Sequence, residues 1–179
     1  MSAAGLLLTS LLPGSWRPDV VTLKSGVHLW DVARGVALAA MGRQRDAYAA
    51  FDAARRLDPS NPMPLVNVAT LHLAAREYDE ARKVLATALE LNPRLARIHN
   101  ELGVIAAETG HVDEAVAHWK RAVELEPREF DTLFNLGSVL VKAGRASEAR
   151  PYLERFLREA PPAVYGRDFA KVRGWLGPT

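Results

Sequence analysis

The fold is decided by one stretch of the chain, residues 96–129, which read ARIHNELGVIAAETGHVDEAVAHWKRAVELEPRE. Leu102, Ile105 and Ala106 stand at the spacing of one face of a helix, and a second set of apolar residues at that spacing follows Gly110. The members of the second set are Ala115, Trp119, Ala122 and Val123. Glycine suits the end of a helix because it enters the left-handed backbone region without steric cost. The stretch therefore predicts two antiparallel helices joined by a tight turn at Gly110.

The same pattern recurs along the chain with a period of 34 residues. A proline closes each occurrence, and an alanine precedes each proline at a constant distance. The prolines are Pro59, Pro93, Pro127 and Pro161, and the alanines are Ala47, Ala81, Ala115 and Ala149. Regular self-similarity of this length is typical of stacked helical repeats. Counting each proline as position 32 divides the chain into units 28–61, 62–95, 96–129 and 130–161.

Two further positions of the unit predict how its helices pack. Position 8 carries a small residue and position 24 a large one, so the two helix backbones can approach closely beside a bulky side chain. The small residues are Gly35, Ala69, Gly103 and Gly137, and the large ones are Phe51, Leu85, Trp119 and Leu153. A proline disfavours helical geometry in the residue before it. We therefore expect the second helices to close at Asp58, Asn92, Glu126 and Ala160.

This arrangement resembles the tetratricopeptide repeat family, in which W-x2-L-G-x2-Y is followed by A, F, A and P at fixed offsets. Seven residues of the third unit carry the resemblance: Leu102, Gly103, Gly110, Ala115, Trp119, Ala122 and Pro127. The pattern is broken by Arg34, by Arg76 in place of the turn glycine, and by Phe156 in place of a small residue. The resemblance implies an all-α protein, a right-handed α-solenoid of about four helix-turn-helix repeats with a C-terminal capping helix.

The two ends of the chain do not follow the repeat. Residues 1–27 are predicted to form an irregular N-terminal segment, in which residues 5–12 are apolar but lack the basic residue and cleavage site of a secretory signal. An upstream element that packs on the repeats, or a start site inside a longer gene, fits this segment better. Residues 162–179 are predicted to form the capping helix because apolar residues recur there at helical spacing. Those residues are Val164, Tyr165, Phe169, Val172 and Leu176.

Composition narrows the function classes. The chain has no cysteine, which excludes disulfides, thiol catalysis and cysteine-bound metals. Lysine and arginine total 23 against 21 acidic residues, and no basic run stands out, so we expect no nucleic acid partner. No stretch reaches the roughly 20 apolar residues that cross a bilayer, so membrane association is not expected. The sequence leaves the compartment open.

No motif for catalysis or for a cofactor is present. His111, Glu114 and His118 could share one helix face, but the first lies in a turn and all three are expected to point to water. Each glycine is single and tied to the repeat, so there is no phosphate-binding loop. We therefore predict no enzyme activity, no cofactor and no metal, and we expect a protein or peptide partner.

The resemblance also implies where that partner binds. In the family, the first helix of each unit lines a concave groove, and the residues at matching positions here are Val32, Val36, Val66, Asn67, Thr70, Leu73, Arg97, Asn100, Val104, Phe134 and Lys142. These residues are apolar early in the chain and polar later. Our hypothesis is that the groove accepts an apolar or amphipathic segment, with Asn67, Arg97 and Asn100 bonding to its backbone or to a carboxylate.

One known kind of groove is not expected here. Members of the family that dock chaperone tails clamp a C-terminal carboxylate with basic and amide side chains, and Val32, Val36 and Glu101 stand at three of the five clamp positions. Two other classes of protein stay open. The chain could be the C-terminal repeat arm of a larger enzyme, sulfatase-like or glycosyltransferase-like, or a membrane-tethered assembly factor with residues 5–12 as the remains of an anchor.

Overall fold

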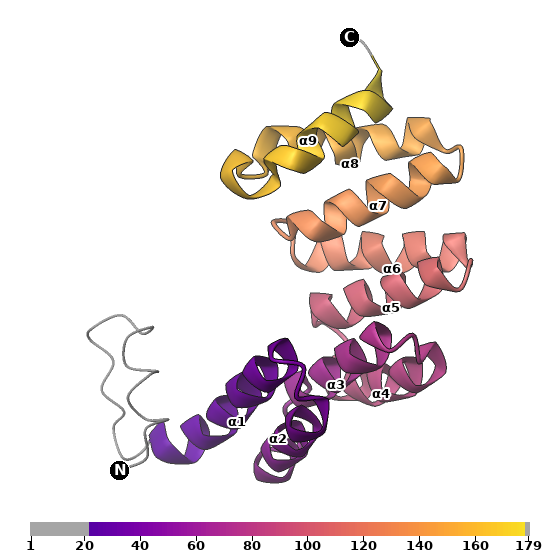
Figure 1. The fold of residues 1–179 in the computed structure, drawn as a ribbon. Helices are drawn as coiled ribbons and strands as arrows, with labels where there is room; N and C mark the ends of the chain where they lie inside the picture. The colour runs from indigo at the N-terminus through magenta and orange to yellow at the C-terminus, as the bar shows by residue number, and fades with distance from the viewer. Residues whose placement is uncertain (1–21, 178–179) are drawn as a thin grey trace. The chain divides into compact units, whose positions relative to one another are not determined.

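The computed structural model describes residues 22–177, with side chains from Trp30 onward, and this range is helical with no strand. Figure 1 shows the helices following one another in chain order. They are α1 (Thr22–Ala40), α2 (Gln44–Leu57), α3 (Met63–Ala74), α4 (Tyr78–Leu91), α5 (Ala96–Glu108), α6 (Val112–Leu125), α7 (Phe130–Lys142), α8 (Ala146–Glu159) and α9 (Pro162–Leu176). The predicted all-α fold is confirmed.

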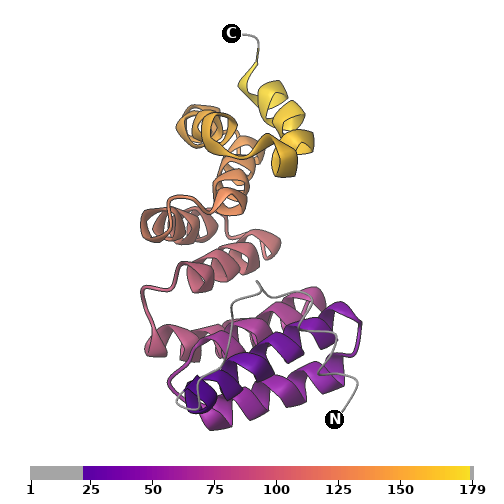
Figure 2. The same cartoon turned by 90° about the vertical axis from the view of Figure 1, so that its left-hand side faces the viewer.

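The chain divides between Asp58 and Pro59 into two compact units. The first contains α1 and α2, which pack against each other as a hairpin. The second contains α3 to α9, in which each helix packs against the next. Within this second unit α3, α5 and α7 lie on one side, with α4, α6 and α8 behind them (Figures 1 and 2). The first helices of the three later repeats therefore share one face.

The helix ends follow the local rules that the sequence predicted. Each second helix ends just before the residue that precedes a repeat proline, and these closing residues are Asp58, Asn92, Glu126 and Ala160. The start of α1 differs from the prediction. Residues 22–27 were predicted to be irregular but are helical. The prediction was wrong because the repeat spacing does not indicate how far the first helix extends before its unit begins. The rest of the predicted irregular segment, residues 1–21, lies outside the described residues.

The turn inside each repeat needs a left-handed backbone. Gly42, Gly110 and Gly144 have φ angles of 73°, 81° and 75°, and Arg76 takes the same conformation in the second repeat with a φ of 60°. An L-residue in this region costs roughly 1–2 kcal/mol that glycine avoids. Arg76 is thus a strained substitute at a glycine position.

Replacing that residue should stabilise the protein. We expect Arg76→Gly to raise the free energy of unfolding by about 0.5–1 kcal/mol, since the relief of strain exceeds the entropy that glycine adds to the unfolded chain. Urea denaturation of the full chain measures the change. Gly110→Arg is the reverse substitution at the equivalent turn and should lower stability. If both substitutions lowered stability, the strain argument would be wrong.

The core of the second unit is built on the predicted pairing of small and large residues. A Cβ atom added to Gly103 would lie 2.7 Å from Nε1 of Trp119, and one added to Gly137 would overlap the side chain of Leu153. Glycine at position 8 thus lets the ring or branched side chain at position 24 lie directly on the helix backbone. The same relation joins Gly35 to Phe51 in the first unit.

The last repeat is closed by α9, as predicted. Phe156 stands where the preceding repeats have alanine, and its ring is fully buried. Its ring centroid lies 5.3 Å from that of Tyr165 and 5.6 Å from those of Phe134 and Phe169. Tyr165 and Phe169 belong to α9, so the departure from the family pattern at Phe156 fills the space between α8 and the capping helix.

Candidate binding surface

Two hollows lie among the helices of the second unit. The first, which we call the acidic hollow, has a volume of about 460 Å³ and is lined by Met63, Leu95, Ala96, Arg97, Asn100, Glu101, Glu126, Glu129 and Asp131. The second, the Trp119 hollow, has a volume of about 220 Å³ and is lined by Val104, Ala107, Glu108, Trp119, Asn135, Ser138, Val139 and Lys142. Both hollows draw most of their lining from α5 and α7 and the connections that precede them.

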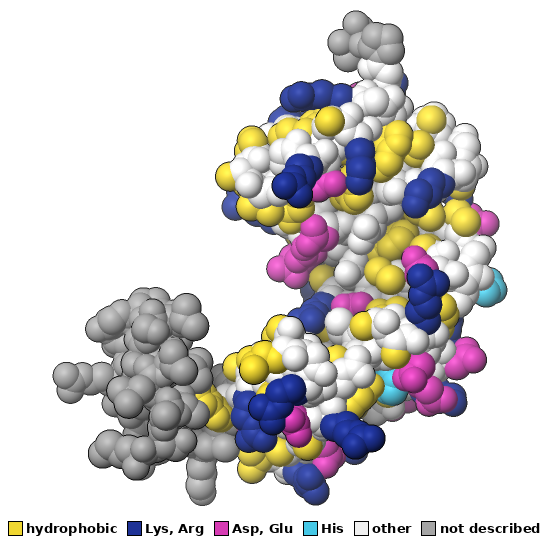
Figure 3. All heavy atoms as spheres, in the orientation of Figure 1, with side chains coloured by type: hydrophobic (Ala, Val, Ile, Leu, Met, Phe, Trp, Pro, Cys, Tyr) yellow, Lys and Arg dark blue, Asp and Glu magenta, His cyan; other side chains and the backbone are white. Residues whose placement is uncertain are grey.

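Negative charge dominates the acidic hollow. Four carboxylates face one guanidinium, that of Arg97, and Figure 3 shows acidic side chains gathered beside the N-terminal end of α7. Burial, followed by the charges of Asp131 and Glu126, raises the pKa of Glu129. A cation placed here would relieve this repulsion between carboxylates.

Arg97 is already engaged within the protein. Its Nη2 donates a hydrogen bond of 3.0 Å to Oδ1 of Asn67, and its Nε lies 4.0 Å from Oε1 of Glu101. Glu101 also accepts a hydrogen bond of 3.4 Å from the hydroxyl of Thr70. The amide nitrogen of Asn67 is buried and has no hydrogen-bond partner among the described residues. The guanidinium thus has less to offer a ligand carboxylate than the sequence alone indicated.

The protonation state of Glu101 should change the free energy of unfolding as the pH changes. Burial raises the pKa of Glu101 above its ordinary value, more than Arg97 and Thr70 lower it. An acid with a raised pKa in the folded state loses stabilising free energy as the pH rises through that pKa. We expect Glu101→Gln, which stays neutral, to be more stable than the parent at pH 7. The gain should shrink as the pH falls toward about 4, where the parent carboxyl is also protonated.

Urea denaturation of both proteins across this pH range tests the prediction. Glu90→Gln serves as the matched control, because Glu90 is an exposed glutamate of α4. It should leave stability unchanged over the same range. A constant difference between Glu101→Gln and the parent at every pH would contradict the argument.

The side chain of Asn100 links three helices by hydrogen bonds. Its Oδ1 accepts hydrogen bonds from Nε1 of Trp119 at 3.0 Å and from the hydroxyl of Thr132 at 3.3 Å. Thr132 is fully buried, so this bond satisfies a polar group that water does not reach. The side chain of Asn100, a residue that the sequence assigned to ligand binding, therefore already joins α5 to α6 and α7 through its oxygen.

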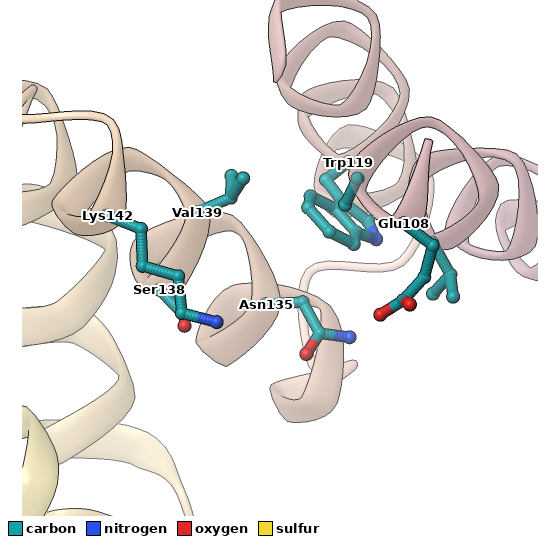
Figure 4. Close-up of a pocket in the computed structure, with 8 residues that line it drawn as sticks. Glu108, Trp119, Asn135, Ser138, Val139 and Lys142 are labelled. Atoms are coloured by element: carbon teal, nitrogen blue, oxygen red, sulfur yellow. The ribbon is translucent and has the colours of Figure 1, made fainter. Parts of the chain in front are cut away.

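The Trp119 hollow is lined by apolar side chains, among them Val104 and Val139, and by the charged side chains of Glu108 and Lys142. Figure 4 shows Trp119 and Glu108 on one side of it and Asn135, Ser138 and Lys142, all from α7, on the other. Glu108 accepts a hydrogen bond of 3.2 Å from the hydroxyl of Tyr78. An apolar ligand group in this hollow would thus have amide, hydroxyl and charged side chains beside it.

The predicted groove residues divide into several groups. Arg97 and Asn100 line the acidic hollow, and Val104 and Lys142 line the Trp119 hollow. The structure links Asn67 to the first of these hollows through its bond to Arg97, and Thr70 through its bond to Glu101. Val32 and Val36 belong to α1 in the first unit.

Three of the predicted residues are used, at least in part, for packing. Val66 is fully buried in the core of the second unit, so it has no surface to offer a ligand and leaves the set of candidates. Leu73 is half-buried against the same core. The Phe134 ring packs against Phe156 and Trp175.

The sequence reading missed several lining residues. Glu126 and Glu129 lie in the connection between α6 and α7, which a list restricted to first helices leaves out. Asn135 stands at position 6 of its unit, the same position as Asn67, and that shared position was a signal that could have found it. The two carboxylates had no such signal.

The described part of the chain offers neither a metal cluster nor a membrane-spanning helix. Between residues 22 and 177 no group of three or more histidine, aspartate and glutamate side chains is arranged to hold a metal ion. Within the same range, every helix is too short or too polar to span a bilayer.

Comparison with known proteins identifies the family. Residues 68–118 and 106–164 match the tetratricopeptide repeat model, and together they span more than half of the chain. The chain therefore belongs to the tetratricopeptide repeat family, as the sequence pattern predicted.

Among curated proteins, E3 SUMO-protein ligase RanBP2 of Homo sapiens is 32% identical over 100 residues, which are 54% of this chain and 3% of that protein. Protein O-mannosyl-transferase Tmtc3 of Drosophila melanogaster is 33% identical over 92 residues, which are 49% of this chain and 10% of that protein. The chain thus matches only a small part of each relative's length.

Solved structures resemble the chain in fold. PilF of Pseudomonas aeruginosa has a TM-score of 0.71 at 21% identity, covering 87% of this chain and 79% of its own. The first repeat domain of Spaghetti (RPAP3), bound to the HSP90 peptide SRMEEVD, has a TM-score of 0.59 at 21% identity, covering 67% of this chain and 95% of its own. The helical solenoid is shared with both.

Proposed function

We propose that this protein is a non-enzymatic interaction module whose α3, α5 and α7 face binds a segment of a partner protein. The observation that carries the proposal is the pair of hollows on neighbouring first helices. One hollow is acidic and the other is partly lined by apolar side chains, so a single extended segment can place different side chains in each. The peptide bound to the Spaghetti repeat domain supports this kind of use for the fold.

The charge of the acidic hollow defines what the segment should carry. Four carboxylates around one engaged arginine favour a lysine or arginine side chain and repel a C-terminal carboxylate. We therefore replace the carboxylate partner of the sequence-based hypothesis with a basic one. Val104, Ala107 and Val139 in the Trp119 hollow favour an apolar side chain nearby, while Asn135 and Ser138 can bond to the segment's backbone.

Selection from a displayed library of random peptides tests the proposal without a known partner. Selection against the full chain should enrich peptides with a basic residue close to an apolar one. We expect Lys142→Glu to strengthen binding of an enriched peptide by about threefold to tenfold, roughly 0.6–1.4 kcal/mol, because a positive charge beside the basic segment is replaced by a negative one. Fluorescence polarisation with the labelled peptide gives the affinities.

Lys83→Glu is the matched control for this experiment. Lys83 is an exposed lysine on α4, behind the proposed face, and pairs with Glu80 at 2.7 Å. It should leave the affinity unchanged. Equal strengthening by both substitutions would show that only the net charge matters. Weaker binding by Lys142→Glu, or enrichment of acidic peptides, would contradict the proposed specificity.

A second candidate function is the repeat arm of a larger enzyme. The specific observation that favours it is the match to Tmtc3, whose name records a mannosyl-transferase. Coding sequence in the same frame next to this chain would separate the two functions. The membrane-tethered alternative depends on residues 5–12, which lie outside the described residues, and fractionation of the full-length protein tests it.

A further inference from the structure

An apolar face of α1 is exposed. Trp30, Ala33, Ala37 and Met41 follow one another at spacings of three and four residues, which places them on one side of the helix. Trp30 is 45% exposed and Met41 70%, and the neighbouring Val36 is 48% exposed. Large apolar side chains gathered on one face of a soluble protein mark a surface that contacts something else.

The repeat register shows what normally covers this face. Trp30 stands at position 3 of its unit, where Ile98 and Thr132 of the third and fourth units are fully buried. Ile98 packs in one cluster with Leu85 and Ala88 of α4, the second helix of the preceding unit. Ala37 stands at position 10 and is exposed, whereas Ile105 at the same position is fully buried. The exposed face of α1 is thus the face on which a preceding helix docks.

We propose that residues 5–12 of this chain cover the exposed face of α1. They read GLLLTSLL, with five leucines and no charged residue. An eight-residue helix is not stable alone in water, so the contact with α1 would have to stabilise the segment. It would then take the place that a preceding unit's second helix takes in the later repeats.

The chain length between the segment and α1 permits this contact. Nine residues, 13–21, separate the leucines from the start of α1. Extended, they reach about 30 Å. From Thr22 to Met41, the residue just after α1, the distance is about 28 Å at the rise of an α-helix, so the segment can fold back as far as Met41. The short tether also gives the segment a local concentration of about millimolar, far above that of a second copy of the chain in dilute solution.

Cysteine cross-linking tests the contact directly, because the chain has no cysteine of its own. The test pair is Leu8→Cys with Ala37→Cys, and the control pair is Leu8→Cys with Ala117→Cys, an exposed alanine on α6. Under mild oxidation the test pair should form an intramolecular disulfide in most molecules, seen by mass and by gel mobility. The control pair should form at least fivefold less. Equal yields in both pairs, or a disulfide only between two molecules, would overturn the proposal.

Hydrogen exchange supplies a second, independent readout. We expect Leu8→Asp with Leu11→Asp to speed amide exchange in residues 30–41 by tenfold or more, because the cover is lost. Thr9→Asp with Ser10→Asp adds the same charge to the same segment and should change the rate less than twofold. If both double variants left exchange in α1 unchanged, the segment would not be the cover.

Discussion

Phe156→Ala is expected to lower the free energy of unfolding by about 3–5 kcal/mol, the largest change among our substitutions. The ring is fully buried and touches Phe134, Tyr165 and Phe169, so its removal leaves a cavity between α8 and α9. Because this aromatic cluster joins α9 to α7 and α8, the capping helix should detach before the rest of the second unit unfolds. Urea denaturation followed by circular dichroism measures the overall loss.

Phe156→Leu is the matched control, since it keeps an apolar side chain of nearly the same reach. It should cost about 1–2 kcal/mol, clearly less than alanine. Hydrogen exchange in residues 162–176 distinguishes detachment of α9 from general destabilisation. A loss below about 1 kcal/mol for Phe156→Ala would mean that the cap contributes little to the fold.

The same glycine-to-alanine change should have opposite effects at two helical sites. Gly103→Ala is expected to lower stability by about 1–3 kcal/mol, although alanine is the better helix former by about 1 kcal/mol. The new Cβ would overlap the Trp119 ring, whose nearest atoms lie at 2.7 and 2.8 Å. Moving that ring also breaks its hydrogen bond to Asn100.

Gly166 of α9 provides the comparison. A Cβ atom added there meets no other atom within 4 Å, and the residue is exposed. Gly166→Ala should therefore raise stability by up to about 1 kcal/mol through helix propensity alone. Both variants are measured by urea denaturation of the full chain. If Gly103→Ala also stabilised the protein, close packing of Trp119 on α5 would not be what the glycine provides.

Much of the fold could be predicted because its signals are local. A proline limits the residue before it, so Asp58, Asn92, Glu126 and Ala160 could be named as helix ends without knowledge of tertiary contacts. The pairing of Gly103 with Trp119 followed from a small and a large residue recurring together. The start of α1 at Thr22 has no such local signal, and the sequence reading placed it too late.

The binding surface was less predictable because position in the repeat does not reveal what a side chain already contacts. Asn100 and Val104 stand at groove positions and both line a hollow, yet the oxygen of Asn100 is already used by internal hydrogen bonds. Val66 shares position 5 with Asn100 and is buried in the core. The acidic character of the first hollow depends on Glu126 and Glu129, which come from a connection between helices.

The aromatic cluster beneath α9 prevents a further repeat from stacking on the C-terminal end of the array. Tyr165 and Phe169 occupy the space on Phe156 that another unit's first helix would need. A tandem copy of this protein fused after Thr179 would find the surface around Phe156 already covered by α9. The two copies would then unfold independently of each other, without cooperativity across the junction.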